Sequence, residues 1–197
     1  MKSTLKITAI VAALATFTLG AKAQTNPTST TTTTSGGVRL SIGVDAGIPT
    51  GKVSDNYKWN LGGSVQADIP VASQLFVTVN AGYNNIFGKN NIAGTNISAT
   101  DIHLLPAKAG LKFFPVQNFY VQGEAGAAFA LNKSDLGFDK SAAFIWAPQI
   151  GYQFPLGGKS YLDAGVRYEA STKFVSTVND SKINFFGLRV AYAFDTK

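Results

Sequence analysis

The segment Phe185-Phe-Gly-Leu-Arg-Val-Ala-Tyr-Ala-Phe194 alternates between a face of large apolar side chains and a face that carries small and charged ones. A period of two is that of a β-strand, whose successive side chains point to opposite sides. Gly187 and Arg189 share one side of this strand, while Leu188 and Val190 lie on the other. Because glycine normally weakens a strand, its place beside a charged residue indicates a crowded polar side.

The same arrangement recurs along the chain, since eight alternating segments each carry a glycine on the polar side. Seven have an apolar residue before and after that glycine, and the eighth is the variant Leu61-Gly62-Gly63. Most are about ten residues or longer, the length of a tilted transmembrane strand and about twice that of an ordinary globular strand. The predicted strands are Val38–Gly47, Trp59–Ile69, Leu75–Tyr83, Ile102–Phe114, Phe119–Leu131, Ala142–Phe154, Tyr161–Ala170 and Ile183–Phe194.

The predicted connections alternate in length. Those after the second, fourth and sixth strands are short and begin with proline: Pro70-Val-Ala-Ser, Pro115-Val-Gln-Asn and Pro155-Leu-Gly-Gly. The others are longer and polar, at residues 49–58, 84–101, 132–140 and 171–182. Short turns at one end, long loops at the other and an even number of strands are typical of outer-membrane β-barrels.

All charged residues within the predicted strands fall on the glycine-bearing face. They are Arg39, Asp45, Asp68, Lys108, Lys112, Glu124, Asp163, Arg167, Glu169 and Arg189. A soluble lipocalin-like barrel or a β-sandwich alternates in the same way, so the charges alone leave open which face points outward. If the apolar face is outward, these ten residues form a lumenal charge network.

Aromatic residues gather near both ends of the apolar face, where a membrane barrel has its two interfacial girdles. Those near the short turns are Phe113, Phe119, Phe154, Tyr192 and Phe194, and those near the long loops are Trp59, Tyr83, Phe129, Phe144, Trp146 and Tyr168. This distribution favours an outward apolar face. The predicted fold is therefore all-β, an eight-stranded antiparallel up-and-down transmembrane β-barrel.

The amino-terminal residues are typical of an exported protein. Lys2 and Lys6 flank the start of an apolar stretch at 7–19, and Ala21-Lys22-Ala23 is a cleavage site of the signal-peptide type. The predicted organisation is a signal peptide at 1–23, a disordered threonine-rich linker at 24–37 and a barrel domain at 38–197. The chain has no cysteine, which excludes disulfides, thiolate metal sites and a lipoprotein anchor.

The net charge is modest once the signal peptide is set aside. The whole chain has a formal net charge of +6. Without the three lysines of the signal peptide, 14 basic and 11 acidic residues remain, so the net charge falls to +3. Such a balance does not indicate nucleic-acid binding. No later apolar stretch is long enough for a transmembrane helix, so we expect any membrane insertion to be as a barrel.

The chain from Val38 to Phe194 resembles the small eight-stranded outer-membrane barrel family that includes OmpX and the barrel of OmpA, and within it the "outer membrane protein β-barrel domain" proteins of diderm bacteria. Leu105-Pro-Ala-Lys-Ala-Gly-Leu-Lys-Phe-Phe114 is similar to a strand that recurs there, and the aromatic end of the last strand resembles the signal read by the barrel-assembly machinery. The resemblance implies a monomer in the outer membrane, surrounded by lipid and lipopolysaccharide, with no cofactor or metal. It implies a fold and no reaction.

Two interpretations of the predicted lumen remain open. The interior of an eight-stranded barrel is just wide enough to be filled by side chains, so five positive and five negative groups would neutralise one another in a plug. The alternative is a narrow channel, or a conduit for small solutes or apolar molecules. We expect the plugged form, with a role in envelope structure or in surface interactions through the loops.

His103 is the only histidine and the only candidate for nucleophilic chemistry. Outer-membrane lipid A deacylases and palmitoyltransferases use a histidine with a serine and an acid nearby. Asp101 shares the parity of His103 and Ser98 lies in the adjoining loop, but no serine follows at the spacing that such a site needs. We therefore expect no enzymatic activity.

The long loops and two strand prolines yield further expectations. Asn84-Asn-Ile-Phe87 and Lys173-Phe-Val175 are predicted to be exposed apolar anchors for a partner, in loops that otherwise read as solvated lysine-rich surface. Pro106 and Pro148 fall inside predicted strands, where proline removes a ladder hydrogen bond. We expect β-bulges or early strand ends there.

Overall fold

The computed structural model describes residues 37–90, 98–177 and 181–197. The predicted signal peptide at 1–23 lies outside the described residues, as does the predicted linker at 24–37 apart from Gly37. Among the described residues, no helix has both the length and the apolar character needed to cross a membrane.

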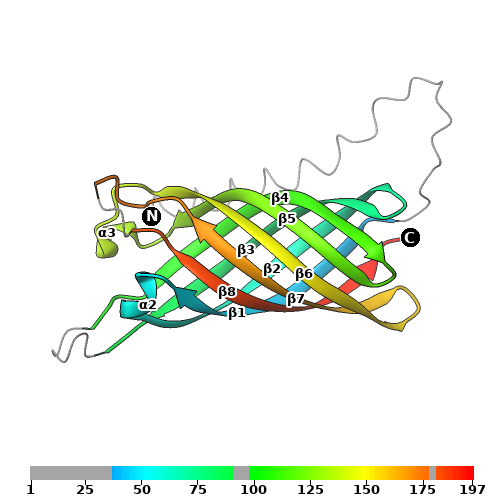
Figure 1. The fold of residues 1–197 in the computed structure, drawn as a ribbon, viewed down its shortest axis with the longest axis horizontal. Helices are drawn as coiled ribbons and strands as arrows, with labels where there is room; N and C mark the ends of the chain where they lie inside the picture. Colours follow the sequence, from blue (N-terminus) through cyan, green and yellow to red (C-terminus); the bar gives the residue numbers. More distant parts are fainter. Residues whose placement is uncertain (1–36, 91–97, 178–180) are drawn as a thin grey trace, which may run out of the picture. The chain divides into compact units, whose positions relative to one another are not determined.

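The strands form one closed antiparallel barrel in which each pairs with the next and β1 pairs with β8 (Figure 1). This confirms the predicted eight-stranded up-and-down fold. The strands are β1 (Arg39–Thr50), β2 (Tyr57–Ala72), β3 (Leu75–Gly88), β4 (Ile102–Val116), β5 (Phe119–Ala130), β6 (Ala142–Gly157), β7 (Ser160–Ser171) and β8 (Asn184–Asp195). Two one-turn helices, α2 (Val53–Asn56) and α3 (Lys133–Leu136), lie in the long connections.

Several strands run further toward the long loops than predicted. β1 continues to Thr50 because Pro49 and Thr50 still pair with β8, and β3 continues to Gly88 against β2. The predicted connections at 49–58 and 84–101 are therefore too long. The alternation of polar and apolar residues stops before the pairing does, since the inward face itself becomes apolar at this end of the barrel.

The three short turns are tighter than predicted. Each strand continues past its proline, and the turn itself has two residues, at 73–74, 117–118 and 158–159. A register shift lies at each of these places, between Pro70 and Ala72, between Phe113 and Val116, and between Pro155 and Gly157. Proline thus marks an irregular pairing next to the turn, where the missing N–H is tolerated.

The prediction of bulges or early strand ends at Pro106 and Pro148 is wrong. β4 and β6 continue through both prolines, and each proline keeps a partner in β5. The pairing is interrupted only on the opposite edge, in β3–β4 beside Pro106 and in β6–β7 beside Pro148, and it resumes in the same register. A proline is accommodated because only one neighbouring strand loses its hydrogen bonds.

The outward face of the barrel is apolar and the inward face is polar. Large apolar side chains such as Ile42 and Ile48 are 62% and 67% exposed, whereas Arg189 is 1% exposed. A soluble lipocalin-like barrel has the reverse arrangement, so that alternative is excluded.

The predicted crowding behind the inward glycines is visible in the pairing of β4 with β5. A Cβ atom added to Gly110 would overlap the carbonyl oxygen of Gly123, and one added to Gly126 would overlap that of Ala107. The backbone of the neighbouring strand therefore leaves no room for a side chain at these two positions. Gly187 is an exception, because the nearest atom would be 3.5 Å away.

Candidate functional site

The barrel lumen contains a group of buried ionised and phenolic side chains that we call the charged layer. Six strands contribute to it: β1, β2, β4, β5, β7 and β8. Its members are Asp45, Asp68, Lys108, Lys112, Tyr120, Glu124, Asp163, Arg167, Glu169 and Arg189, all of them buried. Nine of the ten charges assigned to the lumen by parity lie here, and the tenth, Arg39, is only partly buried nearer the short turns.

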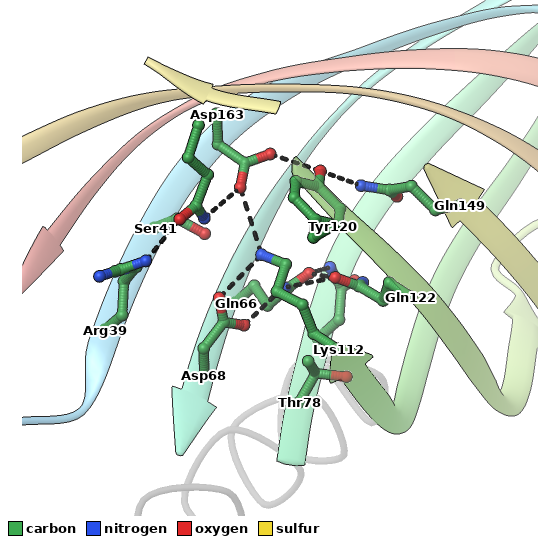
Figure 2. Close-up of polar contacts among 12 residues, drawn as sticks. Arg39, Ser41, Gln66, Asp68, Thr78, Lys112, Tyr120, Gln122, Gln149 and Asp163 are labelled. Carbon is green, nitrogen blue, oxygen red and sulfur yellow. Dashed lines mark hydrogen bonds and ion pairs between the residues drawn. The ribbon is translucent and has the colours of Figure 1, made fainter. Parts of the chain in front are cut away.

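Asp163 is the centre of the charged layer (Figure 2). Its carboxylate accepts hydrogen bonds from the Tyr120 hydroxyl at 2.7 Å and from Gln153 Nε2 at 2.6 Å. Lys112 Nζ lies 3.2 Å from the same carboxylate and 2.8 Å from that of Asp68, so this ammonium joins two anions. A charge-assisted network of this kind holds several strands in one arrangement.

Tyr120 was not anticipated, although it is completely buried at the middle of this network. Gln149 Nε2 donates to its hydroxyl at 2.6 Å, and the Lys112 ammonium lies 4.3 Å from its ring centroid. Gly151 and Gly165 leave the space for it, because a Cβ atom on either would meet the Tyr120 side chain. The sequence signal for this position was its parity, because Tyr120 lies on the same side of its strand as Gln122 and Glu124.

Neutral side chains complete the polar contacts around the charges. Gln66 Nε2 donates to Asp68 at 2.6 Å and Asn80 Nδ2 donates to Gln66 at 3.0 Å. Arg189 donates through Nε to Ser64 and through Nη2 to Ser41, both at 3.0 Å. Amides and hydroxyls therefore satisfy most of the hydrogen bonds that ion pairing alone would leave unmade.

A second set of ion pairs lies nearer the long loops. Lys108 Nζ is 2.7 Å from Glu169 and 3.5 Å from Glu124, and Arg167 Nη2 is 2.7 Å from Asp45. The charged layer as a whole has four cations and five anions, which leaves it close to neutral. Arg167 Nε and Nη1 have no protein hydrogen-bond partner, so this guanidinium is less fully satisfied than its neighbours.

Arg39 closes the polar contacts at the short-turn end. Its Nε and Nη2 donate to Asp195 at 2.7 and 3.1 Å, and its Nη1 donates to Gln153. The guanidinium lies 4.1 Å from the ring centroid of Tyr161. The predicted network did not include Asp195, which follows the last predicted strand.

The lumen near the long loops is filled differently, by a cluster that we call the apolar cap. The large strand members, Ile86, Ile102, Leu104, Ile145 and Phe185, have the same inward parity as the charges, as do the alanines of the cluster, and Phe174 enters from the loop between β7 and β8. The complete cluster is Val53, Ile86, Ile102, Leu104, Ala128, Ala130, Ala143, Ile145, Phe174, Ile183 and Phe185. The face predicted to be polar is therefore apolar at one end.

The prediction that two loop segments expose apolar anchors is wrong. Ile86 and Phe174 are each 0% exposed and belong to the apolar cap. Asn84 is also buried and accepts a hydrogen bond from Asn60, while Phe87 stacks on Trp59 at 4.5 Å between ring centroids. Residues 84–87 were expected to be loop but belong to β3, whereas Phe174 reaches the lumen from the connection between β7 and β8.

The eleven aromatic residues assigned to the girdles lie on the outward face. Trp59, Tyr83, Phe113, Phe144, Trp146, Phe154, Tyr192 and Phe194 are exposed, and Phe119, Phe129 and Tyr168 are half-buried. Neighbouring rings are in contact at both ends, as in the pairs Trp146–Tyr168 and Tyr192–Phe194.

His103 is not assembled with the acid and serine that nucleophilic chemistry would need. Its Nδ1 lies 2.6 Å from the hydroxyl of Tyr83. Both carboxylate oxygens of Asp101 accept hydrogen bonds elsewhere, from Gly88 N and Asn85 Nδ2. Within the described ranges, no three His, Asp or Glu side chains are grouped so as to hold a metal ion.

The sequence was compared with models of known protein families. Residues 9–194 match the model of the outer membrane protein beta-barrel domain. A search of curated proteins gives no match.

Solved structures with a similar fold are small outer-membrane barrels. OprG from Pseudomonas aeruginosa has 13% sequence identity and a TM-score of 0.52, over 81% of this chain and 95% of that one. Ail from Yersinia pestis, in a nanodisc, has 19% identity and a TM-score of 0.52, over 81% and 99%. Neisserial surface protein A has 15% identity and a TM-score of 0.54, over 80% and 96%. At these identities the likeness establishes the fold alone.

Proposed function

The chain belongs to the outer membrane protein beta-barrel domain family, and on that premise we propose that it is an integral outer-membrane protein whose filled lumen makes the barrel a rigid, non-conducting support for its outer loops. In this proposal the protein serves envelope structure or surface interaction and transports nothing through its centre. It acts as a monomer, surrounded by lipid and lipopolysaccharide on its outward face.

The proposal rests on the observation that side chains fill the lumen at two levels along the barrel axis. The charged layer occupies the centre with ion pairs that are almost fully buried, and the apolar cap occupies the end near the long loops. Removing one partner of a buried ion pair leaves an uncompensated charge, so such a layer resists opening. An apolar constriction resists entry of water and ions for a separate reason, because it offers them no hydrogen bonds.

Single-channel conductance in planar bilayers tests the closed lumen. We expect no open steps from the purified wild-type protein, from a cap variant with Phe174→Ala and Phe185→Ala, or from a charge-neutral layer variant with Lys112→Ala and Asp68→Ala. Only the variant that combines all four substitutions should conduct, because it interrupts both fillings. Resolvable open steps from the wild type would overturn the proposal. Heat-modifiable migration in detergent gels serves as the folding control, and a known porin as the positive control.

A narrow polar pathway is the second candidate, and a specific observation favours it. Several buried polar atoms have no protein hydrogen-bond partner, including Asn60 Oδ1, Gln149 Oε1 and two nitrogens of Arg167. Such atoms are the places at which ordered water is found in protein interiors. The same conductance measurement separates the two candidates, since a continuous pathway would give open steps without any substitution.

We also propose that the protein has no catalytic role. The pairing of His103 with Tyr83, and the engagement of Asp101 by Gly88 and Asn85, support this view. In cells, a His103→Ala variant should leave the lipid A profile unchanged, as measured by mass spectrometry. A changed profile would point to an enzyme.

A further inference from the structure

A hollow of about 440 Å³ opens at the loop ends of β6 and β7, beside the segment that leads into β8. Its lining residues are Lys140, Trp146, Ser171, Thr172, Lys173 and Lys182. The volume falls within the range of small-molecule sites, about 300–1,000 Å³. The charged layer and the apolar cap do not use these lysines.

The depth of the hollow in the membrane is indicated by the aromatic residues at its edge. Trp146 is 46% exposed on the outward face, and its ring contacts that of Tyr168, which in turn contacts Phe186. Exposed tryptophan and tyrosine side chains of membrane proteins gather at the level of the lipid headgroups. The hollow therefore lies where a lipid headgroup can reach it from the side.

The lining has the chemistry of an anion site. It combines three lysines with the hydroxyl of Thr172, and none of the described lining residues is a carboxylate. The Ser171 hydroxyl is engaged within the protein, since it donates to the carbonyl of Thr172 and accepts from Ile183 N. The nearby Asp139 accepts a hydrogen bond from Ser176 N at 3.2 Å. Lysine ammonium groups carry three donors each and bind phosphate oxygens through charge-assisted hydrogen bonds.

The backbone around the hollow is held by hydrogen bonds between separate segments. Thr172 N donates to the carbonyl of Phe144 at 2.8 Å, and Phe144 N donates to the Thr172 hydroxyl at 3.1 Å. Lys140 N donates to the carbonyl of Phe174 at 3.1 Å, and the Phe174 side chain is fixed in the apolar cap. Residues on either side of the hollow are thus positioned before any ligand arrives, which lowers the entropic cost of binding.

We propose that this hollow binds the phosphorylated headgroup of a lipid in the outer leaflet. The lysines and the Thr172 hydroxyl contact the phosphate, and Trp146 packs against the apolar part of the same lipid. A lipid is the occupant that uses both features, because a free anion gains nothing from an outward-facing tryptophan. The inference rests on the membrane placement in the proposed function and goes beyond it by assigning a ligand site.

The experiment uses Trp146 as its own reporter. The chain has two tryptophans, so a Trp59→Phe variant of the full protein in detergent micelles leaves Trp146 as the only one. Diphosphorylated lipid A should change its fluorescence saturably, and the same lipid after enzymatic dephosphorylation should require at least about tenfold more. Replacing Lys140, Lys173 and Lys182 by Gln should weaken the apparent affinity about 100-fold, since each lysine near an anionic surface contributes about fivefold.

Lys173 has a further contact within the protein, so the double variant K140Q/K182Q is measured as well and should retain most of the triple variant's loss. The matched control is K52Q/K58Q/K133Q, which removes the same charge from positions outside the hollow at the long-loop end of the barrel and should bind as the parent does. Equal loss in this control would mean general surface attraction and would overturn the proposal. Saturation by inorganic phosphate at the same concentration as lipid A would assign a free anion and overturn the lipid. Heat-modifiable migration and conductance are recorded on the same preparations, so a folded, non-conducting protein that fails to bind overturns this inference alone.

Discussion

The charged layer and the apolar cap both lie on the inward face of the barrel and share the strands β4, β5 and β8, yet they fill the lumen by opposite means. β4 carries Lys108 and Lys112 in the first and Ile102 and Leu104 in the second. In the charged layer each side chain depends on particular partners, because an unpaired buried charge is costly. In the apolar cap the side chains depend on volume, because a cavity costs lost contacts and not lost partners.

Asp163→Ala has the largest expected effect and tests whether the charged layer depends on particular partners. It leaves Lys112, Tyr120 and Gln153 without their shared acceptor. We expect a loss of about 3–5 kcal/mol in the free energy of unfolding, the usual result of breaking a buried ion pair. Urea-induced unfolding in lipid vesicles measures it. Asp135→Ala, at an exposed position of α3, is the control, and a loss below about 1 kcal/mol in D163A would show that the charged layer tolerates missing partners.

Phe174→Ala in the apolar cap should have the next largest effect. The side chain is fully buried and stacks on Phe138 at 4.9 Å between ring centroids. Its removal should cost about 3 kcal/mol through lost burial and the cavity that remains. Phe174→Leu should recover most of this loss, because it restores most of the volume. If leucine were as damaging as alanine, the cap would depend on a specific partner and the contrast with the charged layer would weaken.

Two glycine substitutions sharpen the comparison at a smaller scale. A Cβ atom on Gly151 would overlap the Tyr120 ring in the charged layer, whereas one on Gly187 would have 3.5 Å of space beside Phe185. Gly151→Ala should therefore lose about 1–3 kcal/mol and Gly187→Ala should change stability by less than about 0.5 kcal/mol. Both are measured by the same urea titration. Equal effects would mean that the inward glycines serve the strand backbone and not the packing of Tyr120.

The smallest effect is expected from Arg39→Lys at the short-turn end. The substitution keeps the charge but loses the two-pronged contact with Asp195 and the stacking on Tyr161. Because the ion pair is only partly buried, we expect a loss of about 1 kcal/mol. The exposed Lys159→Arg provides the reverse exchange as a control. A loss as large as that of Asp163→Ala would extend the charged layer to the end of the barrel.

The strand count and the division into a polar and an apolar face follow from local alternation, which a single sequence displays. Which face points outward follows from the aromatic residues near the strand ends. The partners within the charged layer do not, because they depend on how far neighbouring strands are shifted around a closed barrel. Lys112 and Asp163, for example, are 51 positions apart and lie on strands that are not neighbours.

Some of what was missed did leave a signal. Ile86, Ile102 and Phe185 share the parity of the charges, so counting positions in twos beyond the last polar residue assigns them to the inward face. Phe174 has no such signal, since it lies in a connection and its burial depends on the strands that surround it. The prolines near the short turns, Pro70, Pro115 and Pro155, were ambiguous in the sequence. Proline is found both in turns and at irregular strand ends, so it did not show where the strand stops.

The ion pair between Arg39 and Asp195 has a consequence for how the barrel is made. These residues lie directly opposite each other in β1 and β8, the first and last strands, and are 156 positions apart. Contacts of such long sequence separation form late, because a long loop must first be closed. The pair therefore joins the first strand to the last. It forms only when β8 has paired with β1 and all twelve of their paired positions are in register.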